Sequence, residues 1–478
     1  MVIIGGGLAG LACAQTLIRS GRSVVVIEAG PRPGGVVGTR EVDGFHFEAG
    51  PNTIQAGSTA FRTLCGELGL GPELVPSDDR AKVRWLWHRG ALRPLPASPR
   101  EFLGSPLFST RAKLRVASEP LRRWSPPPSE TLEPTLAELL EERLGPEPTE
   151  LLAGAFVRGI YAGRHTELGA RSAFPRLWSL LSDHGSLIRG MIASGRASRR
   201  RRRSGERPLP GPDVRASQLL SFPGGLQRVV DALETAIGPD LRTGDAAVAL
   251  ARNNDGWDVR TSAGRTHSAA NVVLALPAGA AASLLEPSLD AEQRDFLTSI
   301  PHSSVRLAHL GFPPGELELP SGFGYLVPPS ETGPDAPGCL GTIFASNLFP
   351  DRAPSGGAAV SCFYALDAVE GLDAETFCDR AAADLARALG RRTAPRPSAT
   401  WTVGWRHSIA QYRPGHDRRF EALERHLAAN APGLWLAGGW TRGVSVEHVV
   451  ARGREIGERL AVASTTDPKP PVGAGCSG

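Results

Sequence analysis

Apolar residues at the start of the chain follow two patterns, one typical of a buried strand and the other of a helix. Residues 2–4 form a continuous apolar run, and apolar side chains recur at helical spacing across residues 8–19. Gly21 is expected to end that helix, and residues 23–28 form a second predicted strand that contains a continuous apolar run. Strands of this kind on either side of a helix are typical of parallel sheets. The start of the chain therefore predicts a βαβ unit.

Helical spacing dominates the next part of the chain. Residues 94–148 are rich in proline and contain their clearest helix at 132–144. Helical spacing continues over residues 151–160 and 174–192. These segments predict a helical lobe that is inserted into the sheet domain. The basic residues that follow lack apolar anchors, so we expect a mobile loop there.

Strand-like patterns return in the second half of the chain. Residues 222–226 precede an amphipathic helix that ends near Ile237, after which the chain is expected to rejoin the first domain. The strand-like segments there are 246–250, 257–261 and 271–276. Residues 301–412 alternate apolar and polar positions and predict an antiparallel sheet. A buried strand at 434–439 and a helix at 446–461 follow.

Composition is that of an ordinary globular protein. Of the 478 residues, 41% are hydrophobic and 21% are charged, and the net charge of +4 does not indicate a nucleic-acid-binding protein. The six cysteines form no CxxC pairs and have no histidines at metal-ligand spacing, so we expect reduced thiols, mostly buried, and no metal site. The longest apolar stretch, residues 269–285, contains Pro277 and is not expected to span a membrane. No export signal is expected at the N-terminus, which indicates a cytoplasmic protein.

The glycines between the first strand and the first helix have the spacing of a dinucleotide site. Gly5, Gly7 and Gly10 form a GxGxxG pattern. The first glycine allows a tight turn, the second lets the backbone approach a pyrophosphate, and the third permits close helix packing. Glu28 ends the second strand, where its carboxylate can accept hydrogen bonds from ribose hydroxyls. This spacing predicts a dinucleotide but does not separate FAD from NAD.

Two further glycine-rich stretches favour FAD. Residues 32–39 read RPGGVVGT and resemble the GG doublet of FAD enzymes related to amine oxidases. Residues 436–440 read LAGGW and resemble the closing flavin motif of that superfamily. The helix after them would direct its N-terminus at the pyrimidine end of the flavin, where negative charge grows on reduction. The resemblance implies FAD as the cofactor, with contacts at Gly5, Gly6, Gly7, Leu8, Ala9, Gly10, Glu28, Gly34, Gly35, Val36, Gly50, Pro51, Asn52, Thr53, Ala247, Val444, Ser445 and Val446.

Longer motifs resemble the protoporphyrinogen oxidases, flavoenzymes that aromatise the haem precursor. Residues 45–53 read FHFEAGPNT and are similar to the GxxxExGPxS segment of that family. Further similar segments follow in the family's order along almost the whole chain. They are residues 84–87, 92–96, 158–163, 322–328, 411–416 and 443–444.

The resemblance implies that six residues bind the porphyrinogen. These residues are Asn52, Arg84, Gly159, Phe323, Leu326 and Phe363. The asparagine and the arginine match positions that anchor a propionate, and a guanidinium suits this role because it binds a carboxylate through two parallel hydrogen bonds. The three apolar residues match positions that sandwich the macrocycle, and the glycine matches a position where a missing side chain leaves room beside the flavin.

The implied reaction is the six-electron oxidation of protoporphyrinogen IX to protoporphyrin IX in haem biosynthesis, by three hydride transfers to FAD with O2 as the final acceptor. No catalytic side chain is expected, because the cofactor carries the difficult step and the protein positions the substrate. One alternative is a coproporphyrinogen III oxidase, which more basic surroundings of the substrate would favour. Another is an amine or carotenoid oxidoreductase, which the residues around Arg84 oppose. The third is a degenerate FAD-binding module without activity.

Two segments differ from the family pattern. Glu447 and His448 stand where the family often has Asn-Asp, and they would mark lost catalysis if the chain were a binding module. The run Arg199–Arg203 has no counterpart in the family core. Since family members are peripheral membrane proteins, we expect this run and the helical lobe to contact anionic lipid on the inner face of the cell membrane. The expected partners are a porphyrinogen and O2, with a homodimer as a further expectation.

Together these features predict an α/β fold with α+β insertions. A Rossmann-like FAD-binding domain is joined to a mixed-sheet substrate-binding domain and a helical lobe that faces the membrane. The predicted boundaries are 1–85, 220–300 and 413–464 for the FAD-binding domain, 86–195 for the lobe, 196–216 for a mobile basic loop, 301–412 for the substrate-binding domain and 465–478 for a disordered tail.

Overall fold

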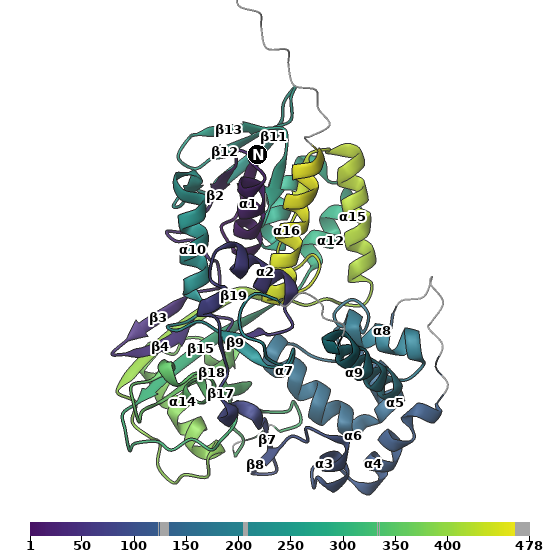
Figure 1. Cartoon of the computed structure of the whole chain (residues 1–478), viewed down its shortest axis with the longest axis vertical. Coiled ribbons are helices and arrows are strands. Elements are labelled where there is room, and N and C mark those ends of the chain that lie inside the picture. The colour runs from purple at the N-terminus through teal and green to yellow at the C-terminus, as the bar shows by residue number, and fades with distance from the viewer. Residues whose placement is uncertain (123, 125–132, 204–208, 332, 334, 464–478) are drawn as a thin grey trace, which may run out of the picture.

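The computed structural model of the chain describes residues 1–122, 124, 133–203, 209–331, 333 and 335–463. Figure 1 shows a nucleotide domain with long helices at the top, a substrate domain built on a second sheet at the lower left, and a helical lobe at the lower right. The first and last described helices, both in the nucleotide domain, lie side by side.

A parallel sheet forms the centre of the nucleotide domain. Its five strands have the order β10-β2-β1-β14-β20. Their bounds in that order are Leu241–Arg242, Val25–Ile27, Val2–Ile4, Val272–Leu274 and Leu434–Leu436. Every neighbouring pair is parallel, and all residues of β1 and β14 are buried. The predicted βαβ unit is confirmed.

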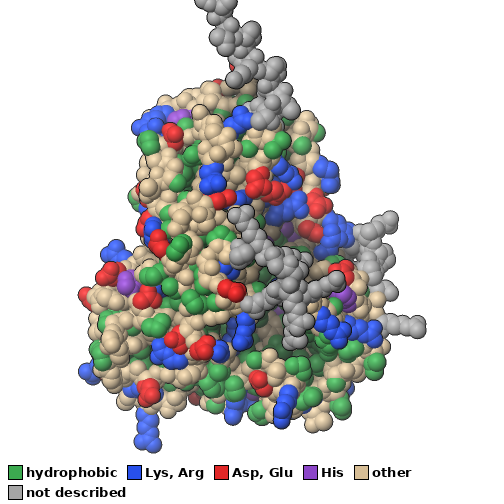
Figure 2. Space-filling view, viewed as in Figure 1, with side chains coloured by type: hydrophobic (Ala, Val, Ile, Leu, Met, Phe, Trp, Pro, Cys, Tyr) green, Lys and Arg blue, Asp and Glu red, His purple; other side chains and the backbone are tan. Residues whose placement is uncertain are grey.

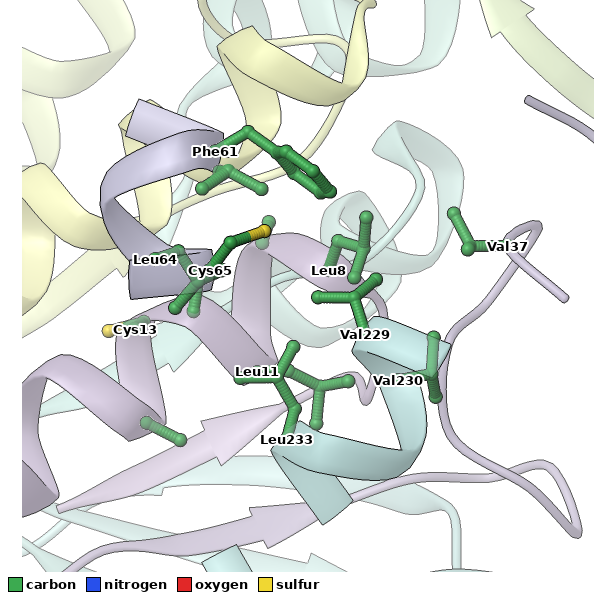
Figure 3. Packing of buried hydrophobic residues seen from close by; sticks show 14 of the residues in the cluster. Leu8, Leu11, Cys13, Val37, Phe61, Leu64, Cys65, Val229, Val230 and Leu233 are labelled. Carbon is green, nitrogen blue, oxygen red and sulfur yellow. The ribbon is translucent and has the colours of Figure 1, made fainter. Parts of the chain in front are cut away.

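Helices cover one face of this sheet. They are α1 (Leu8–Arg19), α2 (Thr59–Glu67), α10 (Gln227–Ile237) and α16 (Val446–Ala463). Figure 3 shows Leu8 and Leu11 of α1 between side chains of α2, such as Phe61, and side chains of α10, such as Val229 and Leu233. Burial of these apolar side chains fixes α1 against the sheet, because each contributes about 1.5–3 kcal/mol when it leaves water.

The opposite face packs against further helices and a small antiparallel sheet. These elements are α11 (Ala278–Leu285), α12 (Ala291–Ser299), α15 (His416–Asn430), β11 (Ala247–Arg252), β12 (Trp257–Thr261) and β13 (Thr266–Ala269). The strands predicted within 246–276 are confirmed as β11, β12 and β14, whereas β13 was not predicted. Thr266–Ala269 is short and polar, so its sequence gives little strand signal.

A seven-stranded mixed sheet forms the substrate domain. The order is β19-β15-β18-β17-β16-β7-β8. The bounds in that order are Ala399–Ala410, His302–Phe312, Ala358–Ala365, Gly341–Ile343, Gly324–Leu326, Trp85–His88 and Ala91–Pro94. One face packs on α14 (Ala374–Ala388), where Phe377 and Leu385 are fully buried. The other face is directed toward the nucleotide domain and the lobe.

Two strands of this sheet correct a predicted boundary. Residues 86–94 were assigned to the helical lobe, but β7 and β8 belong to the substrate sheet, in which β7 pairs in parallel with β16 through Trp85 and Tyr325. Residues so distant in sequence leave no local pattern that would reveal the pairing.

The helical lobe follows β8. Its elements are α3 (Pro99–Gly104), α4 (Thr110–Ala117), α5 (Leu136–Leu144), α6 (Pro146–Pro148), a π-helix over Thr149–Gly154, α7 (Ala155–Tyr161), α8 (Pro175–His184) and α9 (Leu187–Arg203). The predicted helix at 132–144 begins later, at Leu136, behind a Thr135–Glu138 capping box.

The basic run is helical, which corrects the first part of the loop predicted over 196–216, whereas the described residues 209–216 contain no helix or strand. Helix α9 continues through Arg203, as arginine's high helix propensity allows. Its start is fixed by the buried carboxylate of Glu119, which accepts hydrogen bonds from Leu187 N at 3.0 Å and from the Ser186 hydroxyl at 2.5 Å. Residues 204–208 and the tail predicted at 465–478 lie outside the described residues.

Two sequence expectations concern the whole chain. The five cysteines within the described residues are unpaired and buried, as predicted. In the described part of the chain, none of the helices combines the length and the apolar character that crossing a bilayer requires.

Candidate active site

The predicted dinucleotide glycines lie between β1 and α1, at the carboxyl edge of the parallel sheet. Gly5 has a φ of 107°, a left-handed conformation that favours glycine. A Cβ on Gly10 would lie against the carbonyl oxygen of Gly5, so a side chain there would push α1 away from the turn. No atom lies within 4 Å of a Cβ placed on Gly7, so the backbone is open at the position where a pyrophosphate approaches.

The second glycine stretch closes onto the first. Gly34 N donates to Gly6 O at 2.7 Å, and Gly34 and Gly7 form an isolated parallel bridge. Arg32 stabilises this stretch, because its guanidinium donates to the carbonyls of Val37 at 3.0 Å and Pro33 at 3.2 Å. The sequence did not single out this role of Arg32.

Glu28 joins the two glycine stretches at the end of β2. Its Oε2 accepts a hydrogen bond from Gly6 N at 2.6 Å, and its Oε1 accepts one from Gly30 N at 2.7 Å. Each carboxylate oxygen keeps a lone pair for a ribose hydroxyl. Asp245 N donates to Glu28 O, which brings the start of β11 with Ala247 to the same side of the sheet.

The start of α1 fits a dinucleotide diphosphate. Gly7 is the N-cap, and no side chain of the described residues caps the helix. The first-turn amides of Leu8, Ala9 and Gly10 are therefore directed at the open space above Gly7, where an anion is stabilised by hydrogen bonds and by the helix dipole. FAD is the cofactor whose diphosphate this cradle would hold.

Helix α16 extends the cofactor site, and we call the space from the diphosphate cradle at residues 5–10 to the start of α16 at residues 444–446 the groove. A Cβ on Gly453 would lie against Ala9 O, and one on Gly457 would lie 2.8 Å from Thr16 Cβ, so α16 runs parallel to α1 in close contact. Gly453 lies level with Ala9, and α16 has more residues before this level than α1 has, because α16 begins at Val446 and α1 at Leu8. At about 1.5 Å per residue, the start of α16 therefore lies about 9 Å beyond the start of α1. The predicted contacts at 444–446 therefore lie farther along an extended dinucleotide than the diphosphate cradle, as the flavin end of FAD requires.

The segment from Gly50 to Thr53 lies between the two domains. A Cβ on Gly50 would be 2.6 Å from Val36 O, so this segment packs directly on the second glycine stretch. On its other side, Trp405 Nε1 of β19 donates to Ala49 O at 2.7 Å. The predicted cofactor residues at 34–36 and 50–53 are thus brought together, next to the substrate sheet.

The face of the substrate sheet opposite α14 carries two of the predicted macrocycle residues. Leu326 of β16 pairs with Gly341 of β17, which pairs with Phe363 of β18. Paired residues share one face of a sheet, so Leu326 and Phe363 flank a glycine that fills no space between them. Both side chains are half-buried, which leaves part of each accessible for a ligand.

Gly159 lies over this row. A Cβ on Gly159 would lie against Leu326 Cδ2, so helix α7 is in direct contact with the sheet here. The helix is held in place by Arg158, which donates to the carbonyls of Val327 at 3.1 Å and Pro328 at 3.0 Å. Burial lowers the pKa of this arginine. The predicted residues Gly159, Leu326 and Phe363 therefore form one apolar surface.

Arg84 and Phe323 lie at the rim of that surface. Phe323 N donates to Val83 O at 2.7 Å, and the Arg84 guanidinium lies 5.8 Å from the centre of the Phe323 ring. Arg84 is exposed and forms no ion pair with the described residues. Its charge is therefore free for an anionic ligand. Asn52 is engaged within its own turn, where Nδ2 donates to Gly50 O at 2.9 Å, so shared anchoring with Arg84 stays a prediction.

The two residues that differ from the family pattern have structural roles. Glu447, in the first turn of α16, accepts hydrogen bonds from Ala60 N and Phe61 N at 2.9 Å and so caps helix α2. His448 is exposed and its Nδ1 lies 2.9 Å from the Ser445 hydroxyl. Neither arrangement interrupts the groove, and an acidic residue in the first turn of a helix gives no local sign of a partner so distant in sequence.

The sequence of nearly the whole chain is similar to a known protein family and to individual known proteins. Residues 8–460 match the model of the flavin-containing amine oxidoreductases. The chain is 32% identical to the human protoporphyrinogen oxidase over 95% of this chain and 97% of that protein. It is 30% identical to the chloroplastic protoporphyrinogen oxidase of Oryza sativa subsp. japonica over 96% of this chain and 88% of that protein.

Solved structures share the fold over nearly the whole length. A protein from Exiguobacterium sp. 255-15, provisionally named protoporphyrinogen oxidase, superposes with a TM-score of 0.79 at 24% identity over 97% of this chain and 98% of its own. The cyclohexylamine oxidase of Brevibacterium oxydans IH-35A superposes with a TM-score of 0.71 at 18% identity over 97% of this chain and 99% of its own. The chain therefore belongs to the flavin-containing amine oxidoreductase family, as an FAD-dependent oxidoreductase of the protoporphyrinogen oxidase group.

Proposed function

We propose that this chain oxidises protoporphyrinogen IX to protoporphyrin IX in haem biosynthesis. Three hydrides and three protons leave the substrate, and three molecules of O2 accept them to give three molecules of hydrogen peroxide. Bound FAD supplies the hydride acceptor. The side chains of the site hold the macrocycle against the cofactor and exclude water from the reacting carbon.

The single observation that carries this proposal is the apolar surface with a free cation at its rim. A porphyrinogen is a broad apolar ring system with carboxylates on its edge. The row Leu326, Gly341 and Phe363 under Gly159 offers an apolar surface, and Arg84 offers a guanidinium for a propionate. An amine substrate is disfavoured, because Arg84 would repel an ammonium group at this rim.

The charge of the rim also favours a dicarboxylate over a tetracarboxylate. Coproporphyrinogen III carries four propionates, and gripping them requires cations on more than one side of the ring. Of the arginines close to the surface, Arg158 is already bound to the carbonyls of Val327 and Pro328, and Arg93, which pairs with Leu86, lies at the same β7–β8 edge of the sheet as Arg84. The capping role of Glu447 in turn removes the main argument for a module that has lost catalysis.

The test is oxidation of each porphyrinogen in air by the purified flavoprotein, followed by porphyrin fluorescence. We expect kcat/KM for protoporphyrinogen IX to exceed that for coproporphyrinogen III. The reverse order would support the coproporphyrinogen alternative, and no oxidation of either substrate would refute the proposed enzyme.

Arg84 provides a matched test of the substrate anchor. Arg84→Ala removes a charge-assisted hydrogen bond to a propionate, so KM should rise about 10-fold while bound FAD stays unchanged. Arg260→Ala is the control, because Arg260 is an exposed arginine on β12 of the nucleotide domain. An equal effect of both substitutions, or none at Arg84, would remove Arg84 from the substrate site.

We also propose that the helical lobe contacts an anionic membrane surface and that the chain works as a peripheral protein on the inner face of the cell membrane. Exposed apolar side chains support this proposal, including Leu121 at 81% and Leu114 at 66% exposed. Helix α4 of the lobe also carries Arg111, which is exposed, and Lys113, which is half-buried. Figure 2 shows hydrophobic side chains interspersed with Lys and Arg side chains over the lower part of the molecule. Apolar contacts together with cations suit anionic lipid.

Flotation with liposomes tests the membrane proposal. The chain should float with anionic vesicles at low salt, and Leu114→Asp/Leu121→Asp should reduce the floating fraction. Equal recovery with neutral and anionic vesicles, or no flotation, would overturn it. A homodimer stays a prediction that size-exclusion chromatography with light scattering can test.

A further inference from the structure

The turn between β20 and α16 is held by two buried rings from another part of the chain. The Tyr412 hydroxyl donates to Gly439 O at 2.8 Å and accepts a hydrogen bond from Gly443 N at 2.8 Å. His416 Nε2 lies 2.7 Å from Trp440 O, the distance of a hydrogen bond in which the ring nitrogen donates. Two side chains thus fix three backbone groups within one short turn.

The two rings form a rigid pair. Their centres lie 4.0 Å apart with an angle of 13° between the ring planes, and both residues are 5% exposed. Phe296 contacts the other side of His416 edge-on, with ring centres 5.3 Å apart. Burial lowers the pKa of His416 to about 4, so its ring is neutral at neutral pH and keeps one N–H to donate. The pair can therefore hold the turn without movement of its own.

The turn itself has a conformation that needs such support. Gly438 and Gly443 have φ values of 121° and 130°, a region that favours glycine. Glycine gives the backbone many alternative conformations, so bonds to fixed partners are required to select one. The Trp440 indole also donates to Leu276 O at 2.8 Å, at the end of the neighbouring strand.

The turn determines where α16 begins. The first-turn amides of α16 have no hydrogen-bond partner within the helix, and a helix N-terminus stabilises negative charge only over about its first turn. A flavin gains negative charge at its pyrimidine end when it is reduced. The position of the turn therefore controls how strongly α16 stabilises the reduced state.

We propose that Tyr412, supported by His416, is a positioning residue for the flavin, because it fixes the turn before α16 and so sets the electron affinity of the bound cofactor. This inference rests on FAD binding along the groove and not on the identity of the substrate.

The same strand end also reaches the substrate side of the site. Gln411, next to Tyr412, donates from Nε2 to Tyr161 O at 2.9 Å, at the end of helix α7. A Cβ on Gly163 would lie against the Gln411 amide, so the two segments are in close contact. Residues 411 and 412 therefore connect the helix that carries Gly159 with the turn that precedes α16.

The experiment is a redox titration of the purified FAD-loaded chain with reference dyes, together with measurement of the FAD dissociation constant, in the absence of any porphyrinogen. Tyr412→Phe keeps the ring and removes both hydrogen bonds. We expect the FAD dissociation constant to rise about 10-fold and the midpoint potential to fall. A 10-fold loss of preference for the reduced flavin corresponds to about 30 mV for a two-electron couple.

Tyr364→Phe is the matched control. The Tyr364 hydroxyl is buried and donates to Asp384 at 2.8 Å, but it lies on the α14 side of the substrate sheet, away from the groove. The control should change stability without changing the midpoint potential. Equal potentials in Tyr412→Phe and the parent chain would overturn the proposal.

A second variant keeps the proposal testable if Tyr412→Phe does not retain FAD. His416→Gln keeps an N–H that can reach Trp440 O and loses the stacked ring, so it should lower the midpoint potential by a smaller amount. An unchanged potential in a folded, FAD-loaded His416→Gln chain would then refute the positioning role. Because no porphyrinogen is present, failure of the proposed substrate would leave these results unaffected.

Discussion

The two ends of the groove are built in different ways. The diphosphate cradle comes from a short stretch of chain, because Gly5, Gly10, Glu28 and Gly34 all lie within the first 34 residues. The flavin and substrate end is assembled from distant segments of α7, the substrate sheet and the turn before α16. A local site depends on backbone conformation at single residues, whereas an assembled site depends on the packing of whole elements.

The largest effect is expected at the local end. Gly10→Val places a branched side chain against the Gly5 carbonyl and separates α1 from the turn. We expect the chain to purify without flavin absorbance near 450 nm. Gly279→Ala in α11 is the control, because a Cβ there meets no atom within 4 Å. A Gly10→Val protein that retained stoichiometric FAD would contradict the prediction, because it would show that the cradle binds FAD with a side chain at position 10.

Glu48, which precedes the segment between the two ends of the groove, makes a pH-dependent contribution to stability. Burial raises the pKa of Glu48 to about 7, although Arg352 lies 3.5 Å away and Thr39 and Leu226 donate hydrogen bonds to its carboxylate. The unfolded chain releases this proton near pH 4.3, at about the ordinary value. The stabilisation is therefore full below that pH and is lost as pH rises through 7, by at most about 4 kcal/mol.

Glu48→Gln removes the titrating group and should flatten this pH dependence. Urea unfolding of both proteins measures the free energy of unfolding at each pH. The measurements run from about pH 4.5 to about pH 7.5, which is roughly the interval between the pKa of Glu48 in the unfolded chain and its pKa in the folded chain. Glu292→Gln, at an exposed position of α12, should keep the slope of the parent chain. Parallel curves for the parent and Glu48→Gln would contradict a raised pKa.

A smaller effect is expected where the assembled end holds its substrate. Gly159→Ala would push Leu326 into the space proposed for the macrocycle, so KM for protoporphyrinogen IX should rise about 10-fold with FAD retained. Adding Leu326→Val to Gly159→Ala removes the clashing methyl and should restore part of the loss. If the KM of the double variant were as high as that of Gly159→Ala alone, the clash would not involve Leu326.

The smallest effect is expected at the cap of α2. Glu447→Ala leaves Ala60 N and Phe61 N without their carboxylate, which should lower the free energy of unfolding by about 1 kcal/mol. Glu458→Ala, which removes an i,i+4 pair between the exposed Glu458 carboxylate and Arg454 at 3.7 Å, should cost less than half of that. Chemical denaturation of the FAD-loaded Glu447→Ala and Glu458→Ala proteins measures both losses of stability. If Glu447→Ala lost porphyrinogen oxidation with unchanged stability, Glu447 would have a role in catalysis instead of capping.

The same contrast explains what could be predicted from the sequence. Gly5, Gly7, Gly10 and Glu28 were found from spacing because their partners are neighbours in the chain. The resemblance to a family placed Gly159, Leu326 and Phe363 together, but periodicity alone gave no register that pairs Leu326 with Gly341 and Phe363. The roles of Tyr412 and Glu447 were missed, because each depends on backbone groups far away in sequence.

The predicted basic loop shows a different limit. A run of arginines has no apolar periodicity, and the interpretation as a loop followed from that absence. Arginine nevertheless favours helix, and α9 is nucleated by Glu119 on an element far earlier in the chain, so its backbone continues through Arg203. The helix propensity of arginine and hydrogen bonds to the distant Glu119 together make this segment helical. Neither can be seen in the pattern of apolar residues.

Anaerobic mixing of the FAD-loaded chain with protoporphyrinogen IX tests the central claim most directly, because it separates hydride transfer to the flavin from the later reaction with O2. The account predicts that flavin absorbance near 450 nm disappears within the time of one turnover, and that Arg84→Ala slows this step at limiting substrate. A flavin that stays oxidised in the presence of excess porphyrinogen would contradict the proposed function.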